Sequence, residues 1–450
     1  MTDSAAAAPP DPTAMLRSRN FVVLLVFAAL IGVFVSAVAW GFLELVFQAQ
    51  VGVFTDLPHR MGYDTAPWWW LLLVLAIAGV AVAAAIEYLP GEGGHVPALG
   101  LQVGSTEPRM VPGVALAAFG TLALGVVLGP EAPLIAIGAG LAAFAVKAAK
   151  RDAPPQLVIV LAAAGSFAAI SVVLGSPIVA AVLVIEASGL GGATLPLILL
   201  PGLIAAGIGS LVFIGMQSFT GLSTSDFSLS PLPLAKFTDV TWSEIGWSIV
   251  VGVAAALVTF VVVRIARRVA DLAPSRRFLV LPALGLLVAA LAIAFDHATS
   301  KTFDEVLFSG QDQLSGLVRQ AGTWSLGALA FLLLCKGLAW ALSLGGFRGG
   351  PTFPALFLGA AGGIAASHLP GFPASPAIAV GMGAMVVAFL KLPLTAVILP
   401  TALTIEAGPD LIPLVIVGVV VAYLATLALE GVLGAGNART NAAAAEAPSG

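Results

Sequence analysis

The sequence predicts an all-α integral membrane protein, built from full-length, tilted and broken or re-entrant helices in two inverted halves. Three observations predict this class. The 450 residues are 59% hydrophobic and only 9% charged, whereas a globular chain carries roughly 25% charged residues. Apolar runs follow one another along most of the chain, and 50 glycines and 30 prolines interrupt them. Breaks at membrane depth are tolerated only where protein or a water-filled cavity surrounds the unwound backbone.

Composition also excludes several classes of protein and of binding site. A formal net charge of −4 is unsuited to nucleic acid, which binds basic surfaces, so no nucleic-acid partner is expected. The single cysteine, Cys335, excludes a disulfide framework and a cysteine-based metal cluster. It lies in an apolar run, where a buried structural thiol is expected. No cofactor and no metal site are predicted.

The apolar runs justify the predicted helices in order. A full membrane span needs about 20 apolar residues, and several runs are shorter, with a Gly or Pro break beside them. Short runs of this kind predict half-helices that meet near the middle of the membrane. The runs cover 21–47, 67–88, 111–128, 133–146, 156–174, 177–185, 195–216, 245–263, 278–295, 324–344, 354–366, 377–390, 393–405 and 411–429.

The two ends of the chain are low in complexity and predict disordered tails. The first 20 residues contain no hydrophobic segment of the kind that a signal peptide has. The predicted organisation is an N-terminal tail (1–20), a first membrane repeat (21–216), a linker (217–244), a second, inverted membrane repeat (245–433) and a C-terminal tail (434–450).

The basic loops predict an orientation. They lie at Arg17 and Arg19, at 147–151 and at 264–277, and positive loops stay on the cytoplasmic side. Both termini are therefore expected in the cytoplasm, in a multi-pass protein of the cytoplasmic membrane. The stretch 109–147 starts and ends inside, with GPEAP (129–133) between two short apolar runs. It is typical of a re-entrant helix pair.

An internal repeat supports two halves. Pro133-Leu-Ile-Ala-Ile-Gly138-Ala139 after GPEAP matches Pro354-Ala-Leu-Phe-Leu-Gly359-Ala360 after GGPTFP (349–354) at the same spacing. By charge, the first half begins inside and the second begins outside. This pattern predicts an inverted-topology repeat, with the functional site at the interface of the halves near the midplane.

Glu131 is the most informative residue of the sequence. It is the only charged residue between positions 111 and 146, and it lies between two helix breakers. An ionisable group at membrane depth is costly and marks a functional pathway. Its alternative interpretation is a carboxylate at a helix N-terminus. The two are compatible, since an anion can displace such a carboxylate and protonation can release it.

Three breaker motifs, GGHVP (93–97), GPEAP and GGPTFP, are predicted to form the anion site around Glu131. Each is expected to leave free backbone N–H groups at a helix N-terminus, where the helix dipole favours negative charge. None carries Lys or Arg at its tip, and binding without a fixed cation allows fast release. The candidate anion-binding residues are Gly93, Gly94, His95, Gly129, Pro130, Glu131, Ala132, Gly350, Thr352 and Phe353.

With these motifs the chain resembles the CLC family of chloride channels and proton/chloride antiporters, in its prokaryotic form without CBS domains. GGHVP resembles the family's Gly-Ser-Gly-Ile-Pro, GPEAP its Gly-Arg/Lys-Glu-Gly-Pro, and GGPTFP its Gly-Gly-Ile-Phe-Ala-Pro. The run GSPIVAAVLVIEAS (175–188) resembles the family segment that ends in Glu-Glu. The resemblance spans about 21–429. It implies a CLC-like fold, chloride or another small anion as the transported ion, Glu131 as the gate, and a homodimer in the lipid membrane.

The departures from the family pattern fall on functional positions. The chloride-coordinating serine falls on Gly94, the basic residue before the gate on Pro130, and one amide donor on Pro351, which has no N–H. None of Tyr63, Tyr88 and Tyr423 matches the family's coordinating tyrosine. The inner proton glutamate falls on Ala187, while Glu186 matches the first glutamate of that pair.

The leading functional prediction is uncoupled, channel-like anion permeation gated by Glu131, because Ala187 removes the implied proton relay. The alternative is proton-coupled antiport of chloride or fluoride, with Glu186, His95 or a water chain on the inner route. Glu186 can also be a structural carboxylate, and His95 a hydrogen-bonding loop residue. An intramembrane enzyme would need a catalytic or metal-binding cluster at membrane depth, and the other histidines lie in predicted loops or at a run end. No enzyme activity is therefore expected.

Overall fold

The computed structural model describes residues 16–104, 106–189, 191–192, 195–221 and 228–445. These residues form helices and loops, and their one strand-like feature is an isolated bridge between Gly129 and Gly350. The predicted all-α class is confirmed. Residues 1–15, 222–227 and 446–450, which belong to the predicted tails and linker, lie outside the described residues.

Eight helical segments in the described part of the chain are long and apolar enough to cross a membrane. Shorter apolar helices stand between them, as the broken runs predict, and many long helices carry exposed Val, Leu, Ile and Phe side chains. A multi-pass membrane protein is therefore confirmed. The eight segments are Arg19–Arg60, Trp68–Tyr88, Glu131–Ala149, Pro155–Leu174, Leu195–Thr220, Trp242–Ala298, Leu326–Gly346 and Leu411–Val432.

The chain forms two compact units that interleave along the sequence. The first unit contains Met1–Phe42, Val103–Val111 and Leu134–Thr224, and the second contains Leu43–Gln102, Pro112–Pro133 and Ser225–Gly450. The three motifs around Glu131 all belong to the second unit. The site can therefore be described within one unit.

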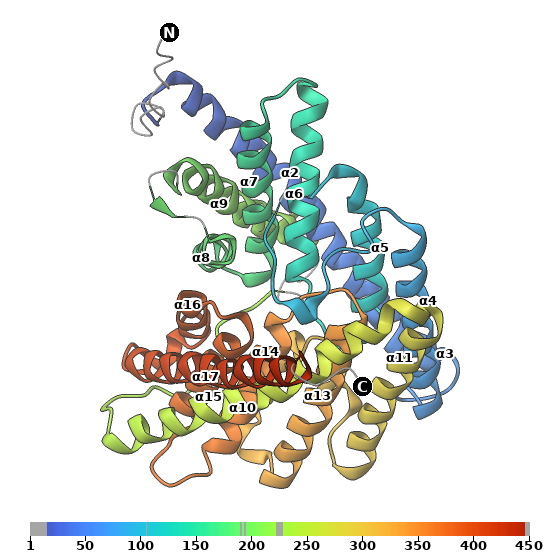
Figure 1. The fold of residues 1–450 in the computed structure, drawn as a ribbon, viewed down its shortest axis with the longest axis vertical. Helices are drawn as coiled ribbons and strands as arrows, with labels where there is room; N and C mark the ends of the chain where they lie inside the picture. Colours follow the sequence, from blue (N-terminus) through green and yellow to red (C-terminus); the bar gives the residue numbers. More distant parts are fainter. Residues whose placement is uncertain (1–15, 105, 190, 193–194, 222–227, 446–450) are drawn as a thin grey trace. The chain divides into compact units, whose positions relative to one another are not determined.

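The first unit is a bundle of closely packed helices (Figure 1). Small residues let the backbones approach, as is usual between helices in a membrane. A Cβ atom at Gly138 would lie 2.9 Å from the carbonyl carbon of Gly165, and one at Gly202 would lie 2.8 Å from the ring of Phe167. The helices are α2 (Arg19–Val51, as far as Phe42), α6 (Glu131–Ala149, from Leu134), α7 (Pro155–Leu174), α8 (Pro177–Ser188) and α9 (Leu195–Thr220).

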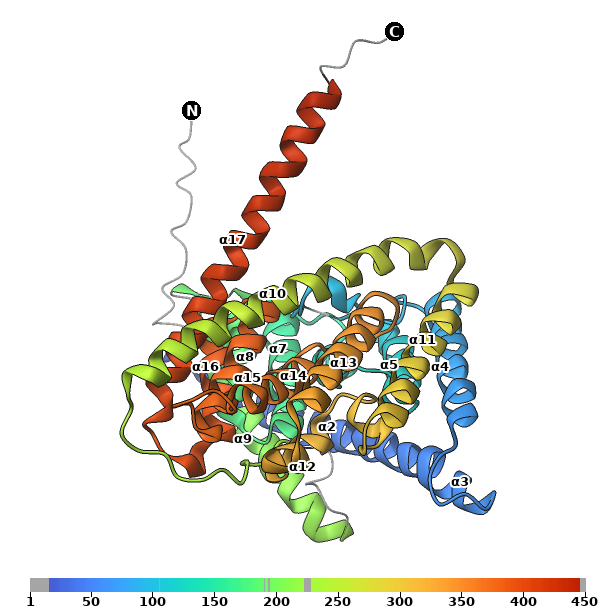
Figure 2. The ribbon, with the colours of Figure 1, turned by 90° about the horizontal axis from the view of Figure 1, so that it is seen from below.

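The second unit contains the remaining helices. The long helix α10 runs along α13, α15 and α17, and α4 packs along α11 (Figure 2). Helix α14 is buried against α13 and α15. The helices are α3 (Leu57–Arg60), α4 (Trp68–Tyr88), α5 (Val111–Leu122), α10 (Trp242–Leu272), α11 (Arg277–Ala298), α12 (Gln311–Arg319), α13 (Leu326–Gly346), α14 (Thr352–Ala366), α15 (Ala374–Leu390), α16 (Pro393–Leu403) and α17 (Leu411–Ala445).

Two expectations differ from the structure. The motif GGHVP is followed by a 3-10 turn of three residues, Pro97–Leu99, so the helix N-terminus expected there is absent. Gly100, with a φ of +94°, ends this turn because a left-handed backbone cannot continue a helix. Helix α17 runs to Ala445, so the tail predicted from residue 434 begins as helix. Its alanines explain this extension, because alanine is the best helix former.

Candidate functional site

Two glycines join the second and third motifs at the centre of the site. The Gly129 N–H donates to the Gly350 carbonyl at 2.7 Å, and the Gly350 N–H donates to the Gly129 carbonyl at 2.6 Å. A Cβ atom on either glycine would overlap the carboxyl group of Glu131. Only glycine therefore leaves room for this carboxyl group between the two loops.

The Glu131 carboxyl group lies at the N-terminus of α14. Glu131 is the first residue of α6 and is fully buried. Its Oε1 accepts the backbone N–H of Thr352, the first residue of α14, at 2.5 Å. Free N–H groups and the helix dipole make such a terminus an anion site. The sequence placed this carboxylate at a helix N-terminus; Glu131 begins α6, and its carboxyl group also meets the N-terminus of α14 in the other motif.

The second carboxylate oxygen is enclosed without a partner. Oε2 of Glu131 and Oγ1 of Thr352 are buried, and neither has a hydrogen-bond partner among the described residues. Phe353 is buried beside them, because a Cβ atom at Gly129 would lie 2.7 Å from its ring. Ala132 is half-buried in the first turn of α6. A buried oxygen without a partner is costly, and this cost favours movement of the carboxyl group away from the site.

The two motifs meet at equivalent positions of the internal repeat. Glu131 and Thr352 are 221 residues apart, as are Gly129 and Gly350 and the repeated prolines 133 and 354. An antiparallel bridge in which two residues exchange both hydrogen bonds is itself two-fold symmetric. This geometry is what a two-fold relation between the motifs requires.

Arg348 connects the third motif to the first. Its guanidinium is buried, and its Nε donates to the Glu92 carbonyl at 3.2 Å. A Cβ atom at Gly93 would lie 3.3 Å from the Arg348 side chain. Arg348 directly precedes GGPTFP in the sequence, and its role in holding the first loop was not predicted. All three motifs are thus brought together in the second unit.

The first motif forms a loop with left-handed glycines. Gly93 and Gly94 have φ values of +70° and +96°. His95 is half-buried, and its Nε2 has no partner in the described part of the chain. Burial lowers the pKa of His95, the backbone of Gly100 opposes this shift, and the charge of Arg348 adds to it. The imidazole is therefore neutral at neutral pH.

Glu186 and Ala187 lie on α8, in the first unit. Both are half-buried. The candidate for the inner proton route thus belongs to a different compact unit from Glu131.

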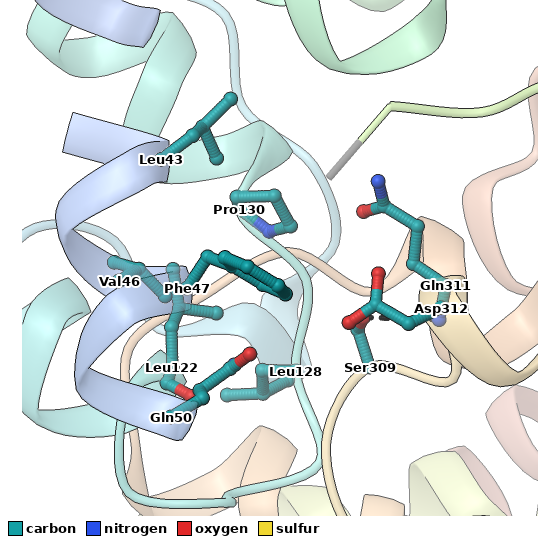
Figure 3. A pocket seen from close by; sticks show the side chains of 10 residues that line it. All are labelled: Leu43, Val46, Phe47, Gln50, Leu122, Leu128, Pro130, Ser309, Gln311 and Asp312. Atoms are coloured by element: carbon teal, nitrogen blue, oxygen red, sulfur yellow. Dashed lines mark hydrogen bonds between the residues drawn. The ribbon is translucent and has the colours of Figure 1, made fainter. Parts of the chain in front are cut away.

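A small polar pocket lies beside Pro130 (Figure 3). Its volume is about 40 Å³, and Pro130, Phe47 and Leu128 form its apolar wall. Ser309, Gln311 and Asp312, at the start of α12, lie across from Pro130. The amide nitrogen of Gln311 is buried without a partner among the described residues, so it can donate to an ion or water. We call this the Pro130 pocket; hydropathy gave no signal for it.

The fold and the site define a class of protein. The chain has many membrane-length helices, and in the second unit a fully buried carboxylate lies at a helix N-terminus with a polar pocket at the neighbouring Pro130. In the described residues no group of three or more His, Cys, Asp or Glu side chains could hold a metal ion. These features are typical of a membrane protein that moves small anions.

Comparison with known proteins agrees with this class. Residues 94–427 match the family described as voltage gated chloride channel, and the chain belongs to this family, the CLC family. YfeO of Salmonella choleraesuis (strain SC-B67), which carries a provisional ion-transport designation, is 29% identical over 427 residues, or 91% of this chain and 95% of YfeO. The same protein of Salmonella schwarzengrund (strain CVM19633) is 28% identical with the same coverage.

Two solved structures share the fold. A slow cyanobacterial chloride/proton antiporter gives a TM-score of 0.69 at 18% identity, covering 90% of this chain and 94% of the other. A CLC-type fluoride/proton antiporter gives a TM-score of 0.63 at 18% identity, covering 90% and 95%. The predicted CLC-like architecture is confirmed, and the chain is an integral membrane protein of a transport family.

Proposed function

We propose that this protein carries chloride or a similar small anion across the membrane through a pathway that Glu131 gates. The observation that supports this proposal is the carboxylate of Glu131 at the N-terminus of α14, bonded to the Thr352 amide. A carboxylate in an anion site competes with the anion. The pathway is closed while Glu131 occupies the site, and it opens when an anion or a proton displaces the carboxylate.

Transport in this proposal is channel-like and uncoupled from protons. Alanine stands at position 187, where the family resemblance puts the inner proton glutamate. A side chain without an ionisable group cannot hold a proton on that route. The proposed anion site at the N-terminus of α14 offers the Thr352 amide without a cation at the tip of its motif, and such a site suits fast binding and release.

The second candidate function is proton-coupled antiport of chloride or fluoride. The two proteins of known structure described above are proton antiporters, which favours this candidate. In this case Glu186, His95 or a water chain carries the proton on the inner side. Under either candidate we infer a homodimer in lipid, with one pathway in each subunit, and both termini in the cytoplasm.

Proton movement separates the two candidates. The protein is reconstituted into liposomes with a chloride gradient, and chloride efflux and internal pH are recorded together. Uncoupled conduction predicts chloride efflux with no proton movement against the proton gradient. Proton uptake driven by chloride efflux would replace the first candidate with the second. Runs with fluoride, bromide and nitrate identify the preferred ion.

The gate is tested by Glu131→Gln, which keeps the size of the side chain and removes its charge. At saturating chloride, where a change in anion affinity does not alter the rate, we expect efflux that no longer depends on pH, because the glutamine side chain does not titrate and protonation cannot displace it. Glu406→Gln removes one exposed carboxylate and is the matched control, with wild-type pH dependence expected. A Glu131→Gln protein with the wild-type pH profile would disprove the gate.

A further inference from the structure

Lys336 is a fully buried lysine in the apolar helix α13. Its Nζ lies against the carbonyl oxygens of one turn of the preceding loop, and no carboxylate of the described residues lies within ion-pair distance of it. The distances are 2.9 Å to Glu305, 3.3 Å to Val306, 3.0 Å to Leu307 and 3.5 Å to Phe308.

These contacts favour an ammonium group. An ammonium has three N–H donors and no acceptor, whereas a neutral amine would point its lone pair at a carbonyl oxygen. Nζ also lies 4.3 Å from the centre of the Phe357 ring, and a ring face attracts a cation. Carbonyl dipoles and a ring thus solvate the charge of Lys336, and its net positive charge remains.

This charge lies close to the site at Glu131. Phe357 is on α14, five residues after Thr352, which is about one and a half helical turns. Gly310 packs on the same ring, because a Cβ atom there would lie 2.6 Å from it. Gly310 leads directly into Gln311 and the Pro130 pocket. Lys336 therefore holds the loop that forms one wall of this pocket.

We propose that Lys336 is a fixed positive charge of the anion pathway and contributes to the anion affinity of the site at the N-terminus of α14. The inference rests on the proposed function and adds a specificity-determining residue to it. None of the three motifs carries a cation at its tip, and the buried Arg348 before GGPTFP donates to the carbonyls of Glu92 and Phe347. A full charge acts over roughly 10 Å even in about 0.1 M salt, and buried charges are screened less.

Two acidic residues of the same loop oppose this charge. Burial raises the pKa of Asp304 to about 6, Thr302 and Lys336 lower it, and Asp296 raises it. Burial also raises the pKa of Glu305, while Lys336 and Lys301 lower it and Asp304 raises it. As pH falls through about 6, Asp304 takes up a proton and its negative charge disappears. Anion affinity should therefore increase toward acid pH.

The first test is Lys336→Met, which keeps most of the side-chain length and removes the charge. In liposomes we expect the half-saturating chloride concentration to rise about tenfold, with a smaller change in the maximal rate. Lys301→Met is the control: Lys301 is half-buried, and its Nζ lies 4.5 Å from the centre of the Trp324 ring. It should leave half-saturation within twofold of wild type. An unchanged half-saturation in Lys336→Met would overturn the inference.

The second test, Glu305→Gln at pH 8, changes affinity in the opposite direction. Lys336 bonds the main-chain carbonyl of Glu305, which this variant retains, and Oε2 of Glu305 has no partner among the described residues. We expect a two- to threefold lower half-saturating chloride concentration, because an opposing charge is lost. If Lys336→Met fails to fold, this variant decides, and an unchanged value overturns the inference. A wild-type protein that carries no anion would instead contradict the proposed function.

Discussion

The proposed gate residue, Glu131, fits its site because two neighbouring residues have no side chain. Gly129 and Gly350 have no Cβ atom, and the Glu131 carboxyl group fills the space that two Cβ atoms would take. The pair of hydrogen bonds between these glycines fixes both loops around the carboxyl group. The position of the gate is therefore set by backbone shape and by its hydrogen bond to the Thr352 amide.

Gly350→Ala tests this arrangement. The added Cβ atom overlaps the Glu131 carboxyl group, so we expect the carboxyl group to leave the Thr352 amide and chloride efflux to lose much of its pH dependence. Overpacking should also lower the free energy of unfolding by about 1–3 kcal/mol. Efflux and thermal unfolding in detergent measure the two effects.

Gly362→Ala is the control for this variant. Gly362 lies on the same helix, α14, and a Cβ atom there meets no atom within 4 Å. Its efflux and unfolding should match wild type. A Gly350→Ala protein with wild-type pH dependence would show that the carboxyl group does not need this space.

At the scale of elements, close helix crossings hold the second unit together. Where α4 crosses α11, a Cβ atom at Gly285 would overlap the Leu75 backbone, and one at Gly79 would overlap the backbone at Leu281. Helices in lipid associate through this kind of close packing, because no hydrophobic effect drives them together. The two glycines are thus part of the stability of the unit that carries the site.

Gly285→Ala should separate α4 from α11 and lower the free energy of unfolding by about 1–3 kcal/mol. Gly337→Ala on α13 is the matched control, since a Cβ atom there meets nothing within 4 Å. It should be neutral or stabilise by about 0.4–1 kcal/mol, because alanine restricts the unfolded chain. Thermal unfolding in detergent compares the pair, and equal midpoints would contradict the packing argument.

At the scale of the whole molecule, equivalent elements recur along the chain. Helix α16 begins 216 residues after α8, and α17 begins 216 residues after α9. The helices before them end alike, α7 at Gly175 and α15 at Lys391, both in the left-handed conformation. A glycine crossing joins α14 to α15 at Gly359 and Gly381, as one joins α6 to α7. This order supports the proposed repeat; its inversion stays a prediction.

The inversion predicts which loops face the cytoplasm, and cysteine labelling tests it. The native Cys335 is buried, so a membrane-impermeant maleimide should not react with it. Ser275 and Ser300 are both exposed and lie at opposite ends of α11. In intact cells we expect Ser300→Cys to react and Ser275→Cys to react only after lysis. The reverse pattern would overturn the orientation taken from the basic loops.

The sequence by itself determined the class of the protein and most helices, because hydropathy and helix breakers act locally. It also identified Glu131, since a lone carboxylate in an apolar run is visible without any contact. Hydropathy did not show that GGHVP lacks a following helix, because the glycine turn at Gly100 depends on backbone conformation rather than on polarity.

Only the tertiary structure decided the hydrogen-bond partners of the buried charged side chains. The amide that meets Glu131 is 221 residues away, and the first motif is held by Arg348 through a main-chain carbonyl. Lys336 looks in sequence like one charge in an apolar run, and its meaning depends on four carbonyls of a distant loop. A carbonyl or amide is the same in every residue, so sequence cannot mark which one a buried charge will bond. Packing chooses it, because a charge in lipid must find a partner within the protein.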